Sequence, residues 1–354
     1  MIYHLAQFYT SYWSALNVVH YVSFRALAAL LSTLFCSFLM GGWFIRHSQR
    51  LFRSKAREFT PETHRAKDNL PTMGGLFIIC VVLLNTLFWC NLADPGVWIM
   101  LICLLGFGAL GAWDDWYKIS KKRGISARAK FILQVLFSAI IVGVWLWFTG
   151  ASCTVTLPFF KTLQPNLGWL FIPWAMFIIV GCSNAVNLTD GLDGLAIGSL
   201  MPNFILYSAL CFLAGNIKLA SYLNIPFAGT AEIAIIGCIL VGASLGFLWY
   251  NTYPAQIFMG DVGSLSLGAG LALMALMCKQ ELLLLISGGI FVAETVSVIL
   301  QVLSYRWYGR RIFKMAPMHH HFELKGWQEA KITVRFAIIS LILCLLALIT
   351  IKIR

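Results

Sequence analysis

The sequence contains few charged residues for its length. Asp, Glu, Lys and Arg make up 11% of the 354 residues, whereas 60% are hydrophobic and the mean hydropathy is +0.81. Soluble globular domains carry about 25% charged residues. The composition therefore excludes a soluble globular protein, and it predicts an all-α protein that crosses a membrane many times.

Several motifs of soluble enzymes are also missing. No G-x-x-x-x-G-K-[ST] sequence occurs, which excludes a P-loop ATPase. The ten cysteines form no C-x-x-C pair and mostly lie in apolar runs, so they indicate neither a disulfide framework nor a zinc site. Residues 106–111 match G-x-G-x-x-G, but they lie inside an apolar run and follow no strand. We therefore attribute these glycines to close helix packing.

Ten apolar runs are long enough, at about 20 residues each, to cross a bilayer as helices. They lie near residues 22–45, 73–92, 97–113, 131–149, 168–184, 195–214, 232–250, 262–278, 282–304 and 335–352. We expect residues 1–354 to form a single integral-membrane domain. Residues 1–21 are aromatic and mildly polar, and we expect them to lie uncleaved at the membrane surface. Between the fourth and fifth runs, the alternation Thr154-Val155-Thr156 predicts a small β-hairpin on the outer face.

The net charge is +12, and most lysines and arginines lie in three loops. These loops follow the first, third and ninth runs, at residues 46–67, 118–130 and 306–335. Because positively charged loops stay in the cytoplasm, we predict that these loops face the cytoplasm and that both termini face outside. A nucleic-acid partner is not needed to explain the basic charge.

The stretch Asn187-Leu188-Thr189-Asp190-Gly191-Leu192-Asp193-Gly194 separates two apolar runs and is too polar for hydrocarbon. If this stretch opens the next helix, Asp190 and Asp193 share one face at i, i+3 spacing. Carboxylates at a helix start suit a divalent cation or the donor groups of a nucleotide. The alternative is a capped helix start with a solvated acid.

Further acidic residues lie at the ends of other runs. Asp114 and Asp115 are adjacent, and because neighbouring helical residues point about 100° apart, we expect them to have different partners. A solvated helix end is the alternative. Asp261 has a glycine on each side and stands in a loop without Lys or Arg, which favours a bound cation.

Other polar residues have more than one explanation. His319, His320 and His321 are consecutive, and they suit a metal site, a proton relay, an anion-binding site or a plain surface segment. Lys67 and Thr72 flank a proline turn and are available to phosphate or hydroxyl groups. Glu294 lies inside the ninth run, where an acid must face a polar interior or a groove; a structural partner suits it as well as a substrate does.

The charge pattern places the acidic stretches, the histidines and the segment with Lys67 and Thr72 on one membrane face. We therefore predict a shared site at the cytoplasmic surface. Carboxylates for Mg²⁺, cations for phosphates and nearby histidines are what phosphoryl transfer at a diphosphate requires.

Five segments together resemble the polyprenyl-phosphate N-acetylhexosamine-1-phosphate transferase family over the whole chain. They are residues 61–64 with 71–75, 114–115, 187–194, 258–264 and 317–323. The resemblance is strongest to the muramoyl-pentapeptide branch of that family. It implies Mg²⁺-dependent transfer of phospho-N-acetylmuramoyl-pentapeptide from UDP-N-acetylmuramoyl-pentapeptide to undecaprenyl phosphate in the bacterial cytoplasmic membrane, giving lipid I and UMP. It also implies a homodimer.

The resemblance carries over to individual residues by motif. It implies that Asp261 is the Mg²⁺ ligand and that Asp114 and Asp115 either activate the lipid phosphate or hold it. A uridine pocket is implied for Lys67, Asp193 and Phe258. A path for the sugar and the diphosphate is implied for Thr72, Asn187, Asp190 and Asn251. The three histidines join the catalytic group, and the sequence leaves open whether an aspartate forms a covalent intermediate.

Two other functions are weighed against this one. A sister enzyme acting on UDP-N-acetylglucosamine would share the aspartate motifs, but it should lack Pro61-Glu62-Thr63-His64 and the three histidines. A secondary transporter should carry its ionisable residues near the middle of broken helices, where this sequence places only Glu294.

Overall fold

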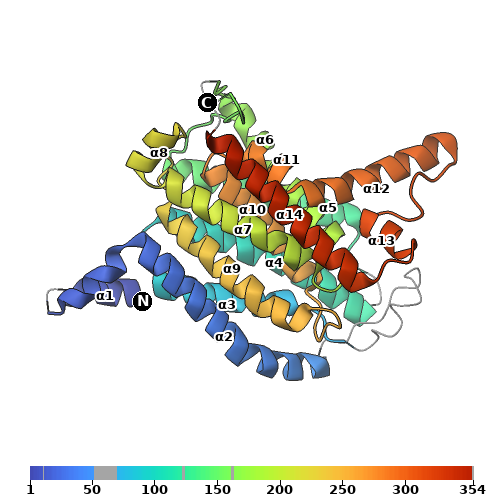
Figure 1. Ribbon diagram of the computed structural model, residues 1–354, viewed down its shortest axis with the longest axis horizontal. Coiled ribbons are helices and arrows are strands. Elements are labelled where there is room, and N and C mark those ends of the chain that lie inside the picture. The colour runs from blue at the N-terminus through green and yellow to red at the C-terminus, as the bar shows by residue number, and fades with distance from the viewer. Residues whose placement is uncertain (11, 52–69, 122–123, 161–162, 353–354) are drawn as a thin grey trace.

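The computed structural model describes residues 1–10, 12–51, 70–121, 124–160 and 163–352, which form a bundle of helices (Figure 1). The α-helices and 3-10 turns (η) are α1 (Ile2–Tyr9), η1 (Ser14–His20), α2 (Val22–Leu51), α3 (Gly74–Trp89), α4 (Pro95–Lys121), α5 (Ala127–Thr149), η3 (Gly168–Leu170), α6 (Phe171–Thr189), α7 (Leu195–Ala214), α8 (Ile217–Leu223), α9 (Ala231–Asn251), α10 (Gly260–Met277), η4 (Glu281–Leu283), α11 (Leu284–Ser287), α12 (Gly289–Tyr308), α13 (Met318–Glu323) and α14 (Glu329–Lys352).

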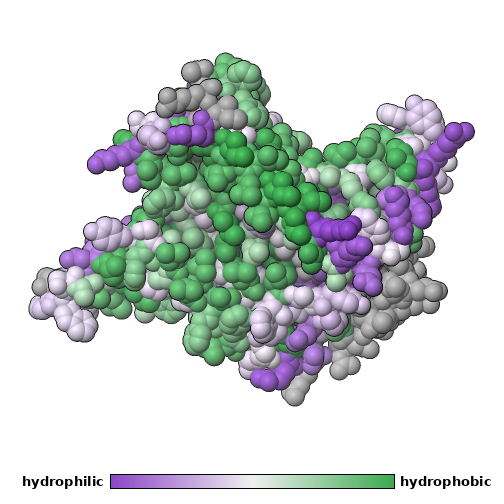
Figure 2. All heavy atoms as spheres, viewed as in Figure 1, coloured by the Kyte–Doolittle hydropathy of each residue, from purple (hydrophilic) through white to green (hydrophobic). Residues whose placement is uncertain are grey.

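The prediction of an all-α, multi-pass membrane protein is confirmed. Within the described part of the chain, nine helices are long and apolar enough to cross a membrane. The second predicted run forms α3, which is apolar but only 16 residues long. The ninth run is interrupted at Gly288, between α11 and α12. Figure 2 shows hydrophobic residues covering the sides of the bundle and hydrophilic residues gathered toward its ends, as expected for helices surrounded by lipid.

The helix α10 forms the centre of the bundle, and every residue after Gly260 in it is buried. It packs against α3, α4, α6 and α7. Two glycines allow backbones to touch there: a Cβ added at Gly75 would lie 2.0 Å from the Gly263 nitrogen, and one at Gly111 would lie 2.3 Å from the Asp261 oxygen. Small residues at such crossings let membrane helices approach closely. The start of α10 is therefore held directly against α3 and α4.

The opposite end of the bundle contains a buried ion pair. Arg25 at the start of α2 donates two hydrogen bonds to Glu232 at the start of α9, at 2.8 and 2.6 Å, and both residues are buried. The backbone nitrogen of Asn91 also donates to Glu232, at 2.8 Å. Removing one partner of such a pair costs about 3–5 kcal/mol, because the other charge is left buried. The pair thus fixes α2 and α9 at this end.

The predicted β-hairpin in the loop between α5 and α6 is wrong. Among the residues described there, Thr154 and Asn166 form a single antiparallel bridge and no strand. Two backbone hydrogen bonds flank this bridge, from Val155 to Pro165 and from Leu167 to Cys153. Proline lacks a backbone N–H, so Pro158 and Pro165 remove the donors that a longer ladder would need.

The helix α12 leaves the bundle, as Figure 1 shows at the right, and its buried residues all lie in its first half. The chain then returns to α13, which packs against α12 and α14. Figure 1 places the two chain ends toward the left of the view and α13 toward the right. The polar segments described next lie at the end of the bundle near α13.

Candidate functional site

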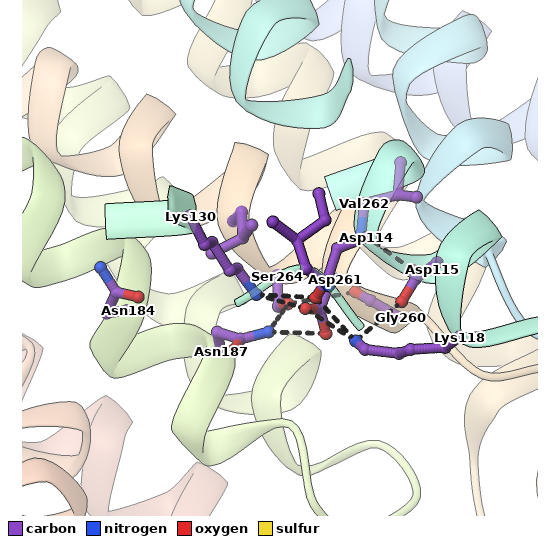
Figure 3. Close-up of polar contacts among 12 residues, drawn as sticks. Asp114, Asp115, Lys118, Lys130, Asn184, Asn187, Gly260, Asp261, Val262 and Ser264 are labelled. Atoms are coloured by element: carbon purple, nitrogen blue, oxygen red, sulfur yellow. Dashed lines mark hydrogen bonds and ion pairs between the residues drawn. The ribbon is translucent and has the colours of Figure 1, made fainter. Parts of the chain in front are cut away.

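Four helices bring polar side chains together at one end of the bundle (Figure 3). Asp114, Asp115 and Lys118 lie in the last turns of α4, and Lys130 lies in the first turn of α5. Asp261 stands in the first turn of the central helix α10. Since α4 packs against both α10 and α5, the end of α4 and the start of α5 bring these side chains to the start of α10.

Two lysine ammonium groups occupy the middle of this cluster. The Nζ of Lys118 lies 3.0 Å from Asp114 Oδ2, 3.2 Å from Asp115 Oδ1 and 2.9 Å from Asp261 Oδ2. The Nζ of Lys130 lies 3.1 Å from Asp114 Oδ2 and also contacts Asp261 Oδ2. The lysines balance carboxylates whose burial would otherwise be costly.

The expectation that Asp114 and Asp115 have different partners is met only in part: both contact Lys118, and each also has a partner of its own. Asp114 Oδ1 accepts a hydrogen bond from the Ile125 backbone nitrogen at 2.7 Å, which ties the start of α5 to α4. Asp115 Oδ2 accepts from the Val262 nitrogen at 3.3 Å, which ties the start of α10 to α4. Asp115 thus combines a charged role with capping of α10.

Asn187 orients the carboxylate of Asp261 from the end of α6. Its Nδ2 donates to Asp261 Oδ1 at 3.1 Å and to Ser264 Oγ at 2.8 Å. Asp261 therefore turns one oxygen toward Asn187 and the other toward the two lysines. A carboxylate held on both sides has a defined direction before any ligand arrives.

The stretch 187–194 does not continue as one helix. The helix α6 ends at Thr189, a tight turn follows, and α7 begins at Leu195. Asp193 is buried, and its Oδ2 accepts from the Ala255 nitrogen at 3.0 Å. Asn251 is buried too: its Oδ1 accepts from the Gly194 nitrogen at 3.0 Å, and its Nδ2 donates to the Ile257 oxygen at 2.8 Å. These two residues lock the 190–194 turn to the 252–258 loop.

Asp190 lies in the same turn and is half-buried. Burial, followed by the neighbouring carboxylates of Asp261 and Asp115, raises the pKa of Asp190 to about 8. Asp190 is thus close enough to sense the charge of the aspartate and lysine cluster.

The segment around Thr72 is docked on the segment that leads into α10. The Phe258 nitrogen donates to the Pro71 oxygen at 2.9 Å, and the Gly74 nitrogen donates to the Phe258 oxygen at 2.8 Å. A Cβ added at Gly260, which has φ +73°, would lie 2.5 Å from Asp115 Oδ2 and 3.2 Å from Thr72 Oγ1. Thr72 and the half-buried Phe258 therefore border the cluster, whereas Lys67 lies outside the described residues.

The three histidines occupy the short helix α13 in three different environments. His319 is 1% exposed, and its Nδ1 lies 3.3 Å from Glu294 Oε1. His320 Nδ1 lies 2.7 Å from Glu323 Oε2. His321 is half-buried, and its Nδ1 accepts from the Lys314 nitrogen at 3.1 Å. Burial lowers the pKa of His319.

The donor set of the cluster fits a Mg²⁺ ion. Asp114 Oδ2 and Asp261 Oδ2 contact the same two ammonium groups and are therefore turned toward one shared space. Mg²⁺ prefers carboxylate oxygens and is commonly held by one or two of them together with substrate phosphates and water. The described residues contain no group of three His, Cys, Asp or Glu side chains that encloses a metal ion alone. The residues thus fit an ion whose coordination a substrate completes.

Sequence reasoning missed Lys118, Lys130 and Ser264 as members of the site. Both lysines were counted only as part of a basic cytoplasmic loop. The i, i+4 spacing of Asp114 and Lys118 could have identified Lys118, because such residues lie on one helix face. For Lys130 the local sequence offers no comparable signal, since its partner Asp261 is far away in the chain.

Comparisons with known proteins agree with this geometry. Residues 97–279 match the model of the family described as glycosyl transferase family 4. Over the full length of both chains, the sequence is 49% identical to proteins named phospho-N-acetylmuramoyl-pentapeptide-transferase from Citrifermentans bemidjiense and Syntrophus aciditrophicus, and 46% identical to the one from Aquifex aeolicus. The chain therefore belongs to glycosyl transferase family 4, among the phospho-N-acetylmuramoyl-pentapeptide-transferases of that family.

Proposed function

We propose that the protein transfers phospho-N-acetylmuramoyl-pentapeptide from UDP-N-acetylmuramoyl-pentapeptide to undecaprenyl phosphate, giving lipid I and UMP. Full-length relatives with 46–49% identity carry the corresponding name. The observation that carries the proposal is the cluster of three aspartates and two lysines at one end of a bundle of membrane-length helices. A soluble nucleotide and a lipid phosphate can meet at such a place.

The reaction exchanges one phosphoanhydride bond for another, so no ATP is needed. An oxygen of the lipid phosphate attacks the phosphorus attached to the sugar. The bond from that phosphorus to the bridging oxygen breaks, and the electron pair leaves with UMP. Negative charge therefore grows on the leaving phosphate, where catalysis is mostly positioning and electrostatic stabilisation.

Lys118 and Lys130 are suited to hold the phosphates during this exchange. A compact ammonium group with several rotatable donors binds phosphate as a point charge. In the described structure both groups contact Asp114 and Asp261. Arriving phosphate oxygens would share these ammonium groups with the carboxylates, and this places the donor diphosphate beside Asp261.

Asp261, with Asp114 beside it, would hold the Mg²⁺ ion. When bound, the ion would neutralise phosphate charge and make the phosphorus easier to attack. Asn187 and Ser264 keep the Asp261 carboxylate aimed at that position. Asp114 and Asp115 activate or hold the lipid phosphate.

The remaining site residues are assigned to the donor substrate. Phe258 offers a ring face on which uracil stacks, and the sequence motif assigns Lys67 to the same uridine pocket. Asp193 and Asn251 use their polar atoms on backbone groups, so we assign them to shaping the uridine and sugar pocket. Thr72, Asn187 and Asp190 border the diphosphate, and at least one of the three histidines of α13 completes the catalytic group.

We further propose that the chain is one transferase domain in the bacterial cytoplasmic membrane, with the site on the cytoplasmic face, both termini outside and two copies forming a dimer. The charge asymmetry of the loops supports the orientation.

UMP release from purified protein tests the proposed function. The reaction contains undecaprenyl phosphate and either UDP-N-acetylmuramoyl-pentapeptide or UDP-N-acetylglucosamine, with Mg²⁺ or with a chelator. We expect UMP and lipid I only with the muramoyl donor, the lipid phosphate and Mg²⁺ together. Release with UDP-N-acetylglucosamine alone would assign the sister activity. No release with either donor from folded protein would reject the transferase.

A further inference from the structure

Glu294 is an acid with an unusual position in the fold. It lies in the membrane-length helix α12, near the point where this helix leaves the bundle, and it is 0% exposed. Its Oε2 has no hydrogen-bond partner among the described residues. Burying a carboxylate is expensive unless it makes specific contacts. The contacts of the other carboxylate oxygen, Oε1, therefore indicate the role of Glu294.

The other oxygen, Oε1, makes two contacts with His319. It accepts a hydrogen bond from the His319 backbone nitrogen at 3.2 Å, and it lies 3.3 Å from Nδ1 of the same residue. The first backbone nitrogens of a helix lack partners within the helix. Glu294 thus holds the beginning of α13 through the His319 backbone nitrogen, and it lies against the imidazole ring of the same residue.

The far side of the His319 ring presses against the acidic turn. A Cβ added at Gly191 would lie 2.2 Å from His319 Nε2 and 2.9 Å from Cε1. The ring is buried, and its Nε2 has no hydrogen-bond partner within the described structure. Gly191 follows Asp190 directly, and Asp193 in the same turn is locked to the 252–258 loop. His319 is thus a spacer between Glu294 and the turn that borders the substrates.

We propose that Glu294 is a positioning residue: through the main chain and ring of His319, it sets where the 190–194 turn stands relative to the aspartate and lysine cluster. Glu294 touches no substrate in this proposal, and His319 acts on the turn by packing. The proposal rests on the proposed transferase function for its kinetic readout. It also has a structural readout that is independent of any activity.

The test compares three variants of the full-length protein in detergent. Glu294→Leu removes the acceptor, and Glu294→Gln keeps an oxygen that can accept from the His319 nitrogen. Thr295→Val is the matched control, because the Thr295 hydroxyl bonds only within α12, to the Phe291 oxygen at 2.9 Å. Diethyl pyrocarbonate, which acylates accessible imidazoles, probes His319, and mass spectrometry locates the modified histidines. The exposed His20 serves as the internal standard.

We expect Glu294→Leu to raise the modification rate of His319 at least about fivefold. The same change should lower kcat about tenfold or more with KM nearly unchanged, because positioning for the transition state is lost. The Gln and Val variants should stay within about threefold of wild type in both measurements. Gly191→Ala displaces the ring from its other side, so it should also expose His319, and it serves where the Leu variant does not fold.

The proposal is overturned if His319 stays protected from modification in both Glu294→Leu and Gly191→Ala. It is also overturned if Glu294→Gln behaves like Glu294→Leu, because the loss would then come from removing the charge of Glu294. Equal loss in Thr295→Val would assign it to general packing. If the wild-type protein releases no UMP, the proposed function fails, whereas the protection of His319 still decides whether Glu294 holds the ring.

Discussion

Lys118 and Lys130 each contact more than one aspartate, and this sharing makes the site sensitive to single charges. Removing one ammonium leaves neighbouring carboxylates partly buried and less well compensated. In the proposed reaction, the same removal takes away a donor for the phosphates. Residues in such a network are strongly coupled, so their effects on activity will not add.

We expect Lys130→Ala to lower kcat/KM about 10²–10³-fold, the range for losing one preorganised charged donor. Lys130→Arg should retain more activity because the charge stays, although the fork geometry differs from that of an ammonium. The activities of both variants are measured by UMP release at saturating lipid phosphate. Lys218→Ala, on the exposed α8 at the other end of the bundle, is the control. Wild-type kinetics in Lys130→Ala would remove this lysine from the site.

Asp261→Asn should abolish turnover while the protein still folds and inserts. The change keeps the shape of the side chain and its contact with Asn187, but it removes the charge that faces the lysines and the proposed cation. Activity is measured against Mg²⁺ concentration. Asp94→Asn, at the opposite end of α4, is the matched control. A near-normal rate with an unchanged Mg²⁺ dependence would refute the assigned role.

Gly191→Ala should strongly reduce turnover, because the added methyl group collides with the His319 ring. His319→Ala removes that ring, so the double variant should be no less active than His319→Ala alone. Kinetics of the two single variants and the double variant form a thermodynamic cycle that measures this coupling. Additive losses would mean that the two residues act independently.

At the scale of elements, hydropathy alone located every helix of membrane length, because a lipid-exposed helix must satisfy its backbone internally and show apolar side chains outside. The break of the ninth run at Gly288 and the short helix α13 were not predicted. The position of α13 depends on contacts such as that of Glu294 with His319, which join residues separated in the sequence. The prediction of a hairpin was wrong because the three-residue alternation at Thr154-Val155-Thr156 is too short to specify a ladder of backbone hydrogen bonds.

The sequence singles out some members of the aspartate and lysine cluster and not others, for physical reasons. Asp114, Asp190 and Asp261 stand out because acids at the ends of apolar runs need an explanation. Lys130 does not stand out, because a basic residue in a cytoplasmic loop is already explained by membrane orientation. Tertiary packing, here the approach of α5 to α10, decides which of many lysines joins the cluster.

The turn η4 contains Glu281, which is 2% exposed. Burial raises the pKa of Glu281 to about 7, with Lys279 and Trp174 opposing the rise. The unfolded chain has an ordinary glutamate pKa of about 4.3. Folding thus favours the protonated form of Glu281. The contribution of Glu281 to stability is therefore greatest below the pKa of the unfolded chain and declines as the pH rises toward 7. Above pH 7 the contribution is constant.

We therefore expect the wild type to be stabilised relative to Glu281→Gln more at pH 5 than at pH 8, as measured by the thermal unfolding temperature in detergent. The glutamine is neutral at both pH values and has a similar shape. Unfolding curves of the wild type and the variant, followed by intrinsic fluorescence, provide the measurement. An identical pH dependence in both proteins would show that Glu281 does not contribute.

At the scale of the whole molecule, the proposed reaction requires every substrate-binding segment to lie on the cytoplasmic side. The structure brings the ends of α4, α6, α9 and α10 together with α13. The excess of Lys and Arg in the loops there predicts that this end faces the cytoplasm. A single wrong crossing would place part of the site outside the cell and separate the nucleotide from the lipid phosphate.

Single cysteines in a background without the ten native cysteines test this orientation. Ser120→Cys and Lys325→Cys lie at exposed positions at the site end, and Lys218→Cys lies at an exposed position on α8. A membrane-impermeant maleimide applied to intact cells should label only Lys218→Cys, and after permeabilisation all three should react. Labelling of Ser120→Cys or Lys325→Cys in intact cells would contradict a cytoplasmic site. Because all ten native cysteines are free, their replacement breaks no disulfide bond in the described chain.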